Sequence, residues 1–128
     1  MAVDYSGTWK LYEQENAEEF LRAISVPVLL FKMINEVKPV TTIHQNGNEF
    51  SICVKAAVRS HTNSFSIGTE TLFNTIDGKQ IKATAQLMDG KIVIETGKFT
   101  HVREIEGEDM IETITFGSAK LIRRSRRI

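Results

Sequence analysis

The C-terminal stretch Met110–Ile128 reads MIETITFGSAKLIRRSRRI and has the pattern of two antiparallel strands. Gly117-Ser118 predicts the tight turn between them, because glycine tolerates the backbone angles of hairpin turns. Successive side chains of a strand point to opposite faces. The mainly apolar face then carries Met110, Glu112, Ile114 and Phe116 on the first strand and Leu121, Arg123 and Ser125 on the second. We therefore expect Glu112 and Arg123 to point into the protein.

These two inward charges need partners, because burying an unpaired charge is costly. Glu112 and Arg123 either pair with each other in a purely structural contact, or Arg123 is available to bind an anion. A guanidinium presents a planar fork of donors that matches a carboxylate. For an anionic ligand, an ionised Glu112 would compete for Arg123. Either Glu112 is then protonated in the complex, or water, His101 and Arg103 share out the charge.

The middle of the chain continues the strand pattern. Asn46-Gly47, Asp77-Gly78 and Asp89-Gly90 are hairpin signals, because a type I′ turn needs positive φ at both central residues. The runs between such turns are rich in Thr, Ile, Val and Phe and alternate, as in Phe50–Val54. The pattern predicts an antiparallel meander, and a sheet of this many sequential strands usually closes on itself.

Two helices are expected between a first strand over Tyr5–Gln14 and the meander. The first follows the helical spacing of Ala17, Phe20, Leu21 and Ile24. Ser25 can cap the second, which takes Pro27 in its first turn and ends at Pro39. Its predicted buried stripe consists of Leu30, Met33, Ile34 and Val37. Val28 and Phe31 lie off that stripe, where they either pack on a barrel rim or form a lid that touches membranes and incoming ligand.

Composition narrows the class of protein. The chain has 128 residues, which predicts a single domain over 1–128, and its 16 Lys and Arg balance its 16 Asp and Glu. This balance argues against a general nucleic-acid binder. One cysteine, Cys53, indicates a reducing compartment, and the N-terminus has neither the basic region nor the apolar run of a secretory signal. We expect a cytoplasmic protein with no stretch long enough to cross a bilayer.

Polar side chains interrupt the expected inward face. They are Thr41, Asn63, Asn74, His101, Arg103, Glu112, Arg123 and Ser125. A filled core would have to satisfy all these groups internally, whereas a cavity that holds water and a polar ligand tolerates them. We therefore favour a cavity over a filled core. His101 is either a satisfied core histidine or a group that contacts the ligand.

Motifs along the whole chain resemble those of a known family. They are Gly7-Thr8-Trp9-Lys10-Leu11, Val37-Lys38-Pro39, Gln45-Asn46-Gly47, Thr62-Asn63-Ser64-Phe65, Asp77-Gly78-Lys79, Met110–Gly117 and Leu121–Ser125. With these motifs the chain resembles the intracellular lipid-binding proteins, the fatty acid-binding protein family. The resemblance is strongest to the liver basic, bile acid-binding type.

The resemblance implies an all-β fold of the lipocalin-like, calycin kind. This is a ten-stranded up-and-down antiparallel β-barrel of two near-orthogonal sheets, capped by a helix-turn-helix lid after the first strand. It implies intracellular binding and transport of bile acids or other amphipathic lipids such as fatty acids. The alternative is a long-chain fatty acid carrier without bile acid preference. The entrance for ligand would lie between the second helix and the turns near Ala57 and Asp77-Gly78.

The residues expected to contact the ligand combine the inward charges with neighbouring apolar positions. They are Arg123, His101, Arg103, Glu112, Ser125, Leu121, Ile114, Phe65, Ile52, Asn63, Ile76, Leu30 and Met33. No cofactor, metal or catalytic residue is expected. Two of the departures from the family pattern concern the pocket. Ser125 replaces the tyrosine with which heart and myelin members clamp a fatty-acid carboxylate, and Arg103 replaces a neutral residue of the liver basic members, so this pocket is expected to be more cationic.

Two other functions match parts of the sequence. An enzyme could use His101, Glu112 and Ser125, but the chain lacks a nucleophile elbow, a phosphate loop and zinc-ligand spacing. A nucleic-acid module could use the arginine-rich C-terminus, but interleaved isoleucines and zero net charge argue against it. We expect a monomer with no nucleic-acid partner. The outward Arg124 and Arg126 are either solvated edge charges or, with Val28 and Phe31, a site of transient membrane contact.

Overall fold

The computed structural model describes residues 4–25, 27–29, 39–55, 60–74, 80–97 and 99–128. In this part of the chain, no helix is long and apolar enough to cross a membrane.

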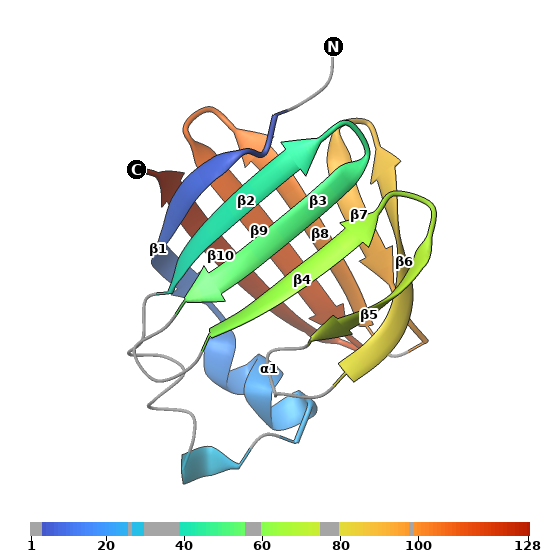
Figure 1. Cartoon of the computed structure of the whole chain (residues 1–128). Coiled ribbons are helices and arrows are strands. Elements are labelled where there is room, and N and C mark those ends of the chain that lie inside the picture. The colour runs from blue at the N-terminus through green and yellow to red at the C-terminus, as the bar shows by residue number, and fades with distance from the viewer. Residues whose placement is uncertain (1–3, 26, 30–38, 56–59, 75–79, 98) are drawn as a thin grey trace.

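The strands form one antiparallel sheet that curls into a barrel (Figure 1). They are β1 (Gly7–Glu15), β2 (Val40–Asn46), β3 (Glu49–Lys55), β4 (Ser60–Ser66), β5 (Glu70–Asn74), β6 (Gln80–Met88), β7 (Lys91–Glu95), β8 (Phe99–Glu106), β9 (Asp109–Phe116) and β10 (Ala119–Arg127). Their order in the sheet is β4-β3-β2-β1-β10-β9-β8-β7-β6-β5. Strands consecutive in sequence are therefore paired, except β4 with β5, and β1 pairs with β10. The front strands β2–β4 run across the back strands β8–β10 (Figure 1). The predicted ten-stranded barrel is confirmed.

Side-chain amides, not a backbone ladder, connect the two end strands β4 and β5. The backbone N–H of Asn74 donates to Oδ1 of Asn63 at 2.8 Å, and Nδ2 of Asn63 donates to the carbonyl oxygen of Asn74 at 3.3 Å. Asn74 in turn donates through its own Nδ2 to the carbonyl oxygen of Thr62. The barrel is therefore nearly closed, with a polar seam where the ladder is missing.

Helix α1 (Ala17–Ala23) follows β1 and lies below the lower end of the barrel (Figure 1). Asn16 precedes it in the left-handed conformation at φ 63°, which Asn adopts more readily than most residues. Phe20 and Leu21 are its buried residues, and Phe20 packs in a cluster with Leu121 and its neighbours. The expected first helix is confirmed. Apart from the helical residues 28 and 29, the expected second helix lies outside the described residues.

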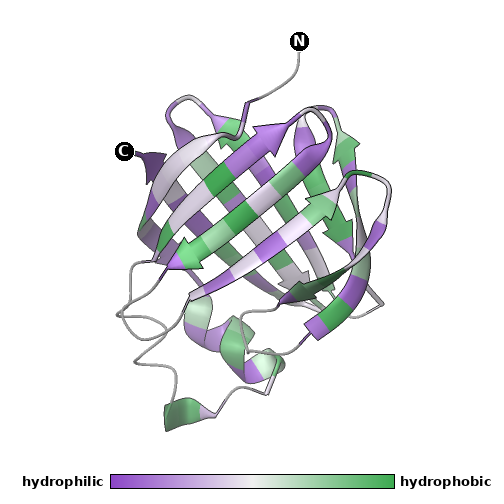
Figure 2. Cartoon of the chain, viewed as in Figure 1, coloured by the Kyte–Doolittle hydropathy of each residue, from purple (hydrophilic) through white to green (hydrophobic). Residues whose placement is uncertain are grey.

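An apolar cluster fills part of the barrel interior. It contains Tyr5, Trp9, Ile43, Phe50, Ile52, Phe65, Phe73, Ala83, Ala85, Ile92, Ile94 and Met110. Tyr5 is fully buried, and its hydroxyl donates to the carbonyl oxygen of Gly90 at 2.6 Å. Burial raises the pKa of Tyr5 to about 12. Figure 2 shows the alternation of hydrophobic and hydrophilic residues along the strands that supplies this core.

The turns follow the sequence signals in part. Asp89 and Gly90 both have positive φ and connect the paired residues Met88 and Lys91, as a type I′ turn requires. The Asn46-Gly47 prediction was wrong in detail. Asn46 ends β2 and pairs with Glu49, so the turn consists of the next two residues, and only its glycine has positive φ. The hairpin at Gly117-Ser118 forms as predicted, since Phe116 pairs with Ala119.

Candidate functional site

A row of polar side chains crosses the inner wall of the barrel. The strand register places Gln14 of β1 opposite Arg123 of β10, Arg123 opposite Glu112 of β9, and Glu112 opposite Arg103 of β8. Residues directly opposite each other in antiparallel strands lie on the same face, where their side chains interact. The four residues therefore form one continuous line, which we call the polar row.

Glu112 is bound from the β8 side of this row. Its Oε1 lies 3.0 Å from Nη2 of Arg103 and 3.0 Å from Nε2 of His101. Glu112 and Arg103 are only 4% and 8% exposed, so they form a buried ion pair. The sequence left open whether Glu112 pairs with Arg123. In the structure its ion-pair partner among the described residues is Arg103, and His101 donates a hydrogen bond to the same oxygen.

Arg123 is consequently left without a counter-charge. Among the described residues its guanidinium makes no ion pair, and its buried Nε has no hydrogen-bond partner. The side chain lines the internal cavity. With His101 neutral, two guanidinium groups and one carboxylate leave one uncompensated positive charge on the wall. A buried unpaired charge is costly, so this arrangement favours an anion beside Arg123.

The pKa shifts agree with this distribution of charge. Burial would raise the pKa of Glu112, but Arg103, the hydrogen bond from His101 and the charge of Arg123 hold it well below its usual range. Burial lowers the pKa of His101, as does Arg103, while Glu112 opposes this shift. Burial also lowers the pKa of Arg123, against the pull of Glu112. At neutral pH Glu112 is therefore ionised and His101 neutral, donating from Nε2.

Gln14 joins the row through a break in the strand register. Between Leu11 and Glu13 the pairing with β10 shifts, so Glu13 faces Arg124 and Gln14 faces Arg123. The amide oxygen of Gln14 is buried and has no hydrogen-bond partner among the described residues. Sequence alternation alone did not identify this residue, because a bulge changes which positions face inward.

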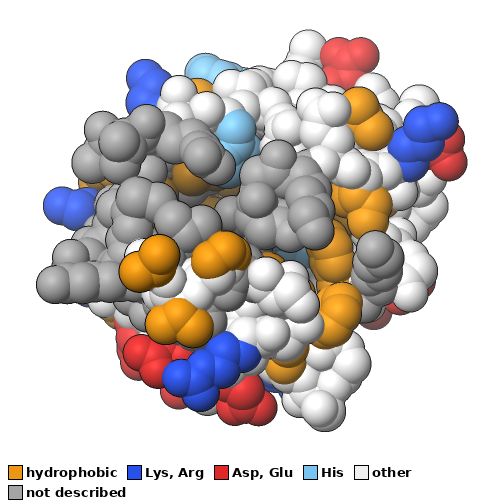
Figure 3. Space-filling view, turned by 90° about the horizontal axis from the view of Figure 1, so that it is seen from below, with side chains coloured by type: hydrophobic (Ala, Val, Ile, Leu, Met, Phe, Trp, Pro, Cys, Tyr) orange, Lys and Arg blue, Asp and Glu red, His pale blue; other side chains and the backbone are white. Residues whose placement is uncertain are grey.

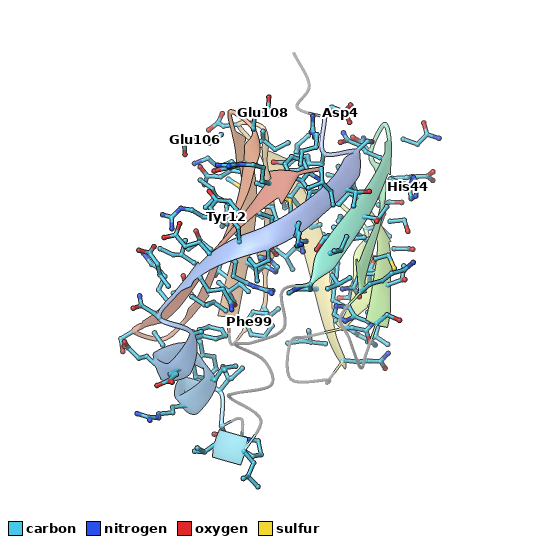
Figure 4. All side chains as sticks on the ribbon, turned by 90° about the vertical axis from the view of Figure 1, so that its left-hand side faces the viewer. Asp4, Tyr12, His44, Phe99, Glu106 and Glu108 are labelled. Carbon is cyan, nitrogen blue, oxygen red and sulfur yellow. The ribbon has the colours of Figure 1, made fainter. Side chains whose placement is uncertain are left out.

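The cavity adjoins the apolar cluster, of which Phe65, Phe73 and Ile94 line it, and has a volume of about 680 Å³. Small-molecule sites in proteins usually occupy about 300–1,000 Å³. Phe99, Ile114 and Phe116 line it from the back strands, and Phe20 lines it from α1. Figure 4 shows Phe99 between the two layers of the barrel near its lower end, whereas Asp4, Glu106 and Glu108 lie at the upper end. From below, hydrophobic side chains gather around that lower end (Figure 3).

Most of the expected site residues that the structure describes do line this cavity. They are Arg123, His101, Arg103, Glu112, Ile114, Phe65 and Asn63. Ser125, Leu121 and Ile52 are buried but do not line it. Leu121 packs in the cluster with Phe20, and Ile52 packs in the apolar cluster that contains Tyr5 and Trp9. Ile76, Leu30 and Met33, and the expected entrance near Ala57 and Asp77-Gly78, lie outside the described residues.

Several lining residues were not among those expected to contact ligand. They are Phe20, Ala23, Ile24, Ser25, Thr41, Val54, His61, Phe73, Asn74, Gln80, Ile81, Ile94, Thr96, Phe99 and Phe116. The sequence identifies Thr41 and Asn74 only as polar interruptions of the inward face. The alternation of β6–β8 could have identified Ile81, Ile94 and Phe99. The contribution of α1 could not be read from the chain, because it depends on how the helix docks on the barrel.

Apart from Arg123, the arginines of β10 all have partners. Nη1 of Arg124 lies 3.0 Å from Glu15. Nε of Arg126 lies 3.1 Å from Asp109. The guanidinium of Arg127 lies 4.4 Å from the centre of the Trp9 ring. The arginine-rich C-terminus is therefore not a free basic arm, which agrees with the argument against nucleic-acid binding.

The geometry that a serine hydrolase requires is absent from the described part of the chain. Ser125 lies opposite Met110, two positions from Glu112, and makes no hydrogen bond with His101 within that part. The same part contains no group of three His, Cys, Asp or Glu side chains able to hold a metal ion.

Comparison with known proteins agrees with this architecture. A model described as "Lipocalin / cytosolic fatty-acid binding protein family" matches residues 1–128. The chain is 48% identical to the liver fatty acid-binding protein of Schroederichthys bivius over 97% of this chain and 98% of the relative.

Solved structures agree as well. Zebrafish ileal bile acid-binding protein complexed with cholic acid superposes with a TM-score of 0.87 at 31% identity, covering 97% of this chain and 98% of that one. The REP1-NXSQ fatty acid transporter superposes with a TM-score of 0.92 at 25% identity, over 99% of this chain and 98% of the other.

Proposed function

Because this chain belongs to the lipocalin / cytosolic fatty-acid binding protein family, we propose that it binds and transports bile acids or other amphipathic lipids such as fatty acids in its internal cavity. The observation that carries this proposal is the uncompensated Arg123 in the wall of a cavity of about 680 Å³. An amphipathic anion matches both features, since its apolar body replaces water in the cavity and its head group supplies the missing charge.

The site supports a carrier and not an enzyme. Glu112 and His101 are engaged with each other and with Arg103, and the relatives named above are binding and transport proteins. The ligand contacts proposed here are Arg123, His101, Arg103, Glu112, Ile114, Phe65 and Asn63, all of which line the cavity. Phe20 and Phe99 are added to them as apolar contacts at the lower end.

Displacement of a fluorescent apolar probe tests this function. Delipidated protein should take up the probe, and a bile salt such as cholate or a fatty acid such as oleate should release it, whereas nucleic acid should not. The two ligands also separate the alternatives. Release by both supports a carrier of broad range, and release by oleate alone supports a fatty acid carrier without bile acid preference. Failure of both ligands to release the probe would refute the proposal.

We further propose that ligand transfer involves transient contact with membranes. Val28 is 69% exposed and Leu29 is 92% exposed, a few residues after α1. Phe31, also expected to contribute, lies outside the described residues. The paired state of Arg124 and Arg126 makes the apolar residues the better support. Val28→Ser with Leu29→Ser should slow transfer of a fluorescent fatty acid to vesicles without changing its affinity, and an unchanged transfer rate would contradict the contact.

We also propose that the protein acts as a monomer and that it resides in the cytoplasm, since its single cysteine is typical of a reducing compartment. Sedimentation of the purified protein with and without oleate tests the oligomeric state, and imaging of a tagged chain tests its location.

A further inference from the structure

We propose that Glu112 sets the charge of the head group that the cavity accepts: by neutralising Arg103, it leaves Arg123 to balance one negative charge. This inference rests on the proposed function and goes beyond it, because it assigns a selectivity to a residue that itself repels anions. It predicts preference for a monoanionic head group over both an uncharged and a dianionic one.

The geometry separates the two arginines. Arg103 is committed to Glu112 through a contact of 3.0 Å between Nη2 and Oε1. Glu112 lies directly between Arg103 and Arg123 in the polar row, yet Arg123 makes no ion pair in the described part of the chain. A purely structural network would contain equal numbers of opposite charges. This one has an excess of a single positive charge, on the residue that is not engaged.

Because water is largely excluded from the wall, this excess charge makes binding selective for the charge of the head group. Charges interact more strongly where water is excluded. An uncharged head group would leave Arg123 unpaired in the cavity wall. A dianion would place its second charge near Glu112 with no cation to balance it. His101 does not supply that cation at neutral pH, because it already donates to Glu112 and burial disfavours its protonation. Only a monoanion leaves the wall neutral.

Three ligands with the same twelve-carbon chain provide the test. Dodecanol is uncharged, dodecyl sulfate is a monoanion, and dodecyl phosphate at pH 8 is a dianion, because the second pKa of a phosphate monoester is about 6. Their affinities are measured by displacement of a fluorescent apolar probe, below the concentrations at which they form micelles. If the phosphate binds only as its monoanion, about one molecule in a hundred has that form at pH 8, about two units above the second pKa. Its apparent affinity is then lower by about a hundredfold.

The wild type and three variants form a series in which the net charge of the cavity wall changes, with glutamine as the uncharged replacement. Counting Arg103, Arg123 and Glu112, the wall carries one positive charge in the wild type and in Arg103→Gln with Glu112→Gln. It carries two positive charges in Glu112→Gln and none in Arg103→Gln. Glu104→Gln is the matched control, because Glu104 is the next residue along β8 and forms its ion pair with Lys91 outside the cavity. Circular dichroism checks that each variant is folded.

The wild type and Glu104→Gln should bind dodecyl sulfate about ten- to a hundredfold more tightly than dodecyl phosphate. Glu112→Gln should reduce or reverse this ratio. Arg103→Gln should bind dodecanol at least as well as either anion, and the double variant should return to the wild-type preference. If Glu112→Gln does not fold, Arg103→Gln and the double variant still decide, because they differ by one charge at position 112.

The outcomes distinguish the two proposals. If the wild type binds none of the three ligands and neither cholate nor oleate, the proposed function fails. If it binds them but all folded variants show the same ratio of sulfate to phosphate affinity, the function stands and the role of Glu112 is refuted.

Discussion

Arg123 and Arg124 are adjacent in β10, but the two faces of the strand give them opposite environments. Arg124 points outward, where its Nη1 lies 3.0 Å from Glu15 and 3.7 Å from Glu13, both about half exposed. Arg123 points inward, where Glu112 is already bound to Arg103. The outward arginine thus has two carboxylates beside it, and the inward one has no ion-pair partner in the described part of the chain.

This difference is the reverse of what stability alone would favour. Ion pairs in water contribute little, because solvent already stabilises both charges. A buried charge loses that solvation and needs a partner nearby. An inner face that pairs one arginine and leaves the other free therefore indicates a site whose last partner is a ligand. Variants of the two faces test this interpretation.

The largest expected effect is on the buried pair. Glu112→Leu leaves Arg103 and Arg123 unpaired in the barrel wall, and breaking a buried pair costs about 3–5 kcal/mol in the free energy of unfolding. Replacing both partners, Arg103→Leu with Glu112→Leu, should recover most of this loss, because no arginine from the pair then remains unbalanced. Urea unfolding measures both. Equal destabilisation of the single and double variants would show that charge balance is not the cause.

The next effect concerns affinity for anions. Arg123→Ala should weaken binding of cholate or dodecyl sulfate by about ten- to a hundredfold, because losing a charge-assisted hydrogen bond in a site that excludes water costs about 1.5–3 kcal/mol. Uncharged analogues should lose much less. Arg124→Ala is the control and should bind as the wild type does. If both variants bind bile salt equally, Arg123 does not form the anion site.

A smaller effect is expected on the pH dependence of stability. The pKa of His101 is lowered in the folded state by burial and by Arg103. Below about pH 6.5 the unfolded chain therefore binds more protons at this residue than the folded protein does, and the free energy of unfolding falls as the pH decreases.

His101→Gln removes this contribution. Its stability should decline less between pH 7 and about pH 5, and the dependence of bile-salt binding on pH between about 5 and 8 should change as well. Urea unfolding and probe displacement at several pH values measure the two quantities. Identical slopes for wild type and variant would mean that the protonation of His101 is not linked to folding.

The smallest effect is expected on the outer face. Arg124→Ala should change the free energy of unfolding by no more than the error of a urea titration, since Arg124 and both its partners are screened by solvent. High salt should change wild type and variant equally. A clear loss of stability would show that the outer ion pairs fasten β1 to β10 and would weaken the contrast between the two faces.

The sequence predicted the faces well because strand alternation is a local property. The period of two in β9 and β10 placed Glu112 and Arg123 inside and Arg124 outside, and all three positions are as predicted. The same rule placed His101 and Arg103 on the inner face of β8. Apolar spacing also identified the buried residues of α1.

Features that depend on contacts between distant segments were not predicted. The bulge after Leu11 brings Gln14 into the polar row, and the Asn63–Asn74 contacts replace the ladder between β4 and β5. Neither has a sequence signal of its own, because both depend on how the sheet curls. The docking of α1, which makes Phe20 part of the cavity wall, is a third example.

By itself, then, the sequence determined which charged side chains enter the barrel, because a strand must present alternate residues to the core and to water. Only the tertiary structure decided how those charges are distributed. Glu112 has an arginine on each side of it in the sheet. The sequence of the C-terminal hairpin, taken alone, indicates Arg123 as its partner. The packing of β8 against β9 brings Arg103 and His101 to the same carboxylate oxygen, and this leaves Arg123 free to face the cavity.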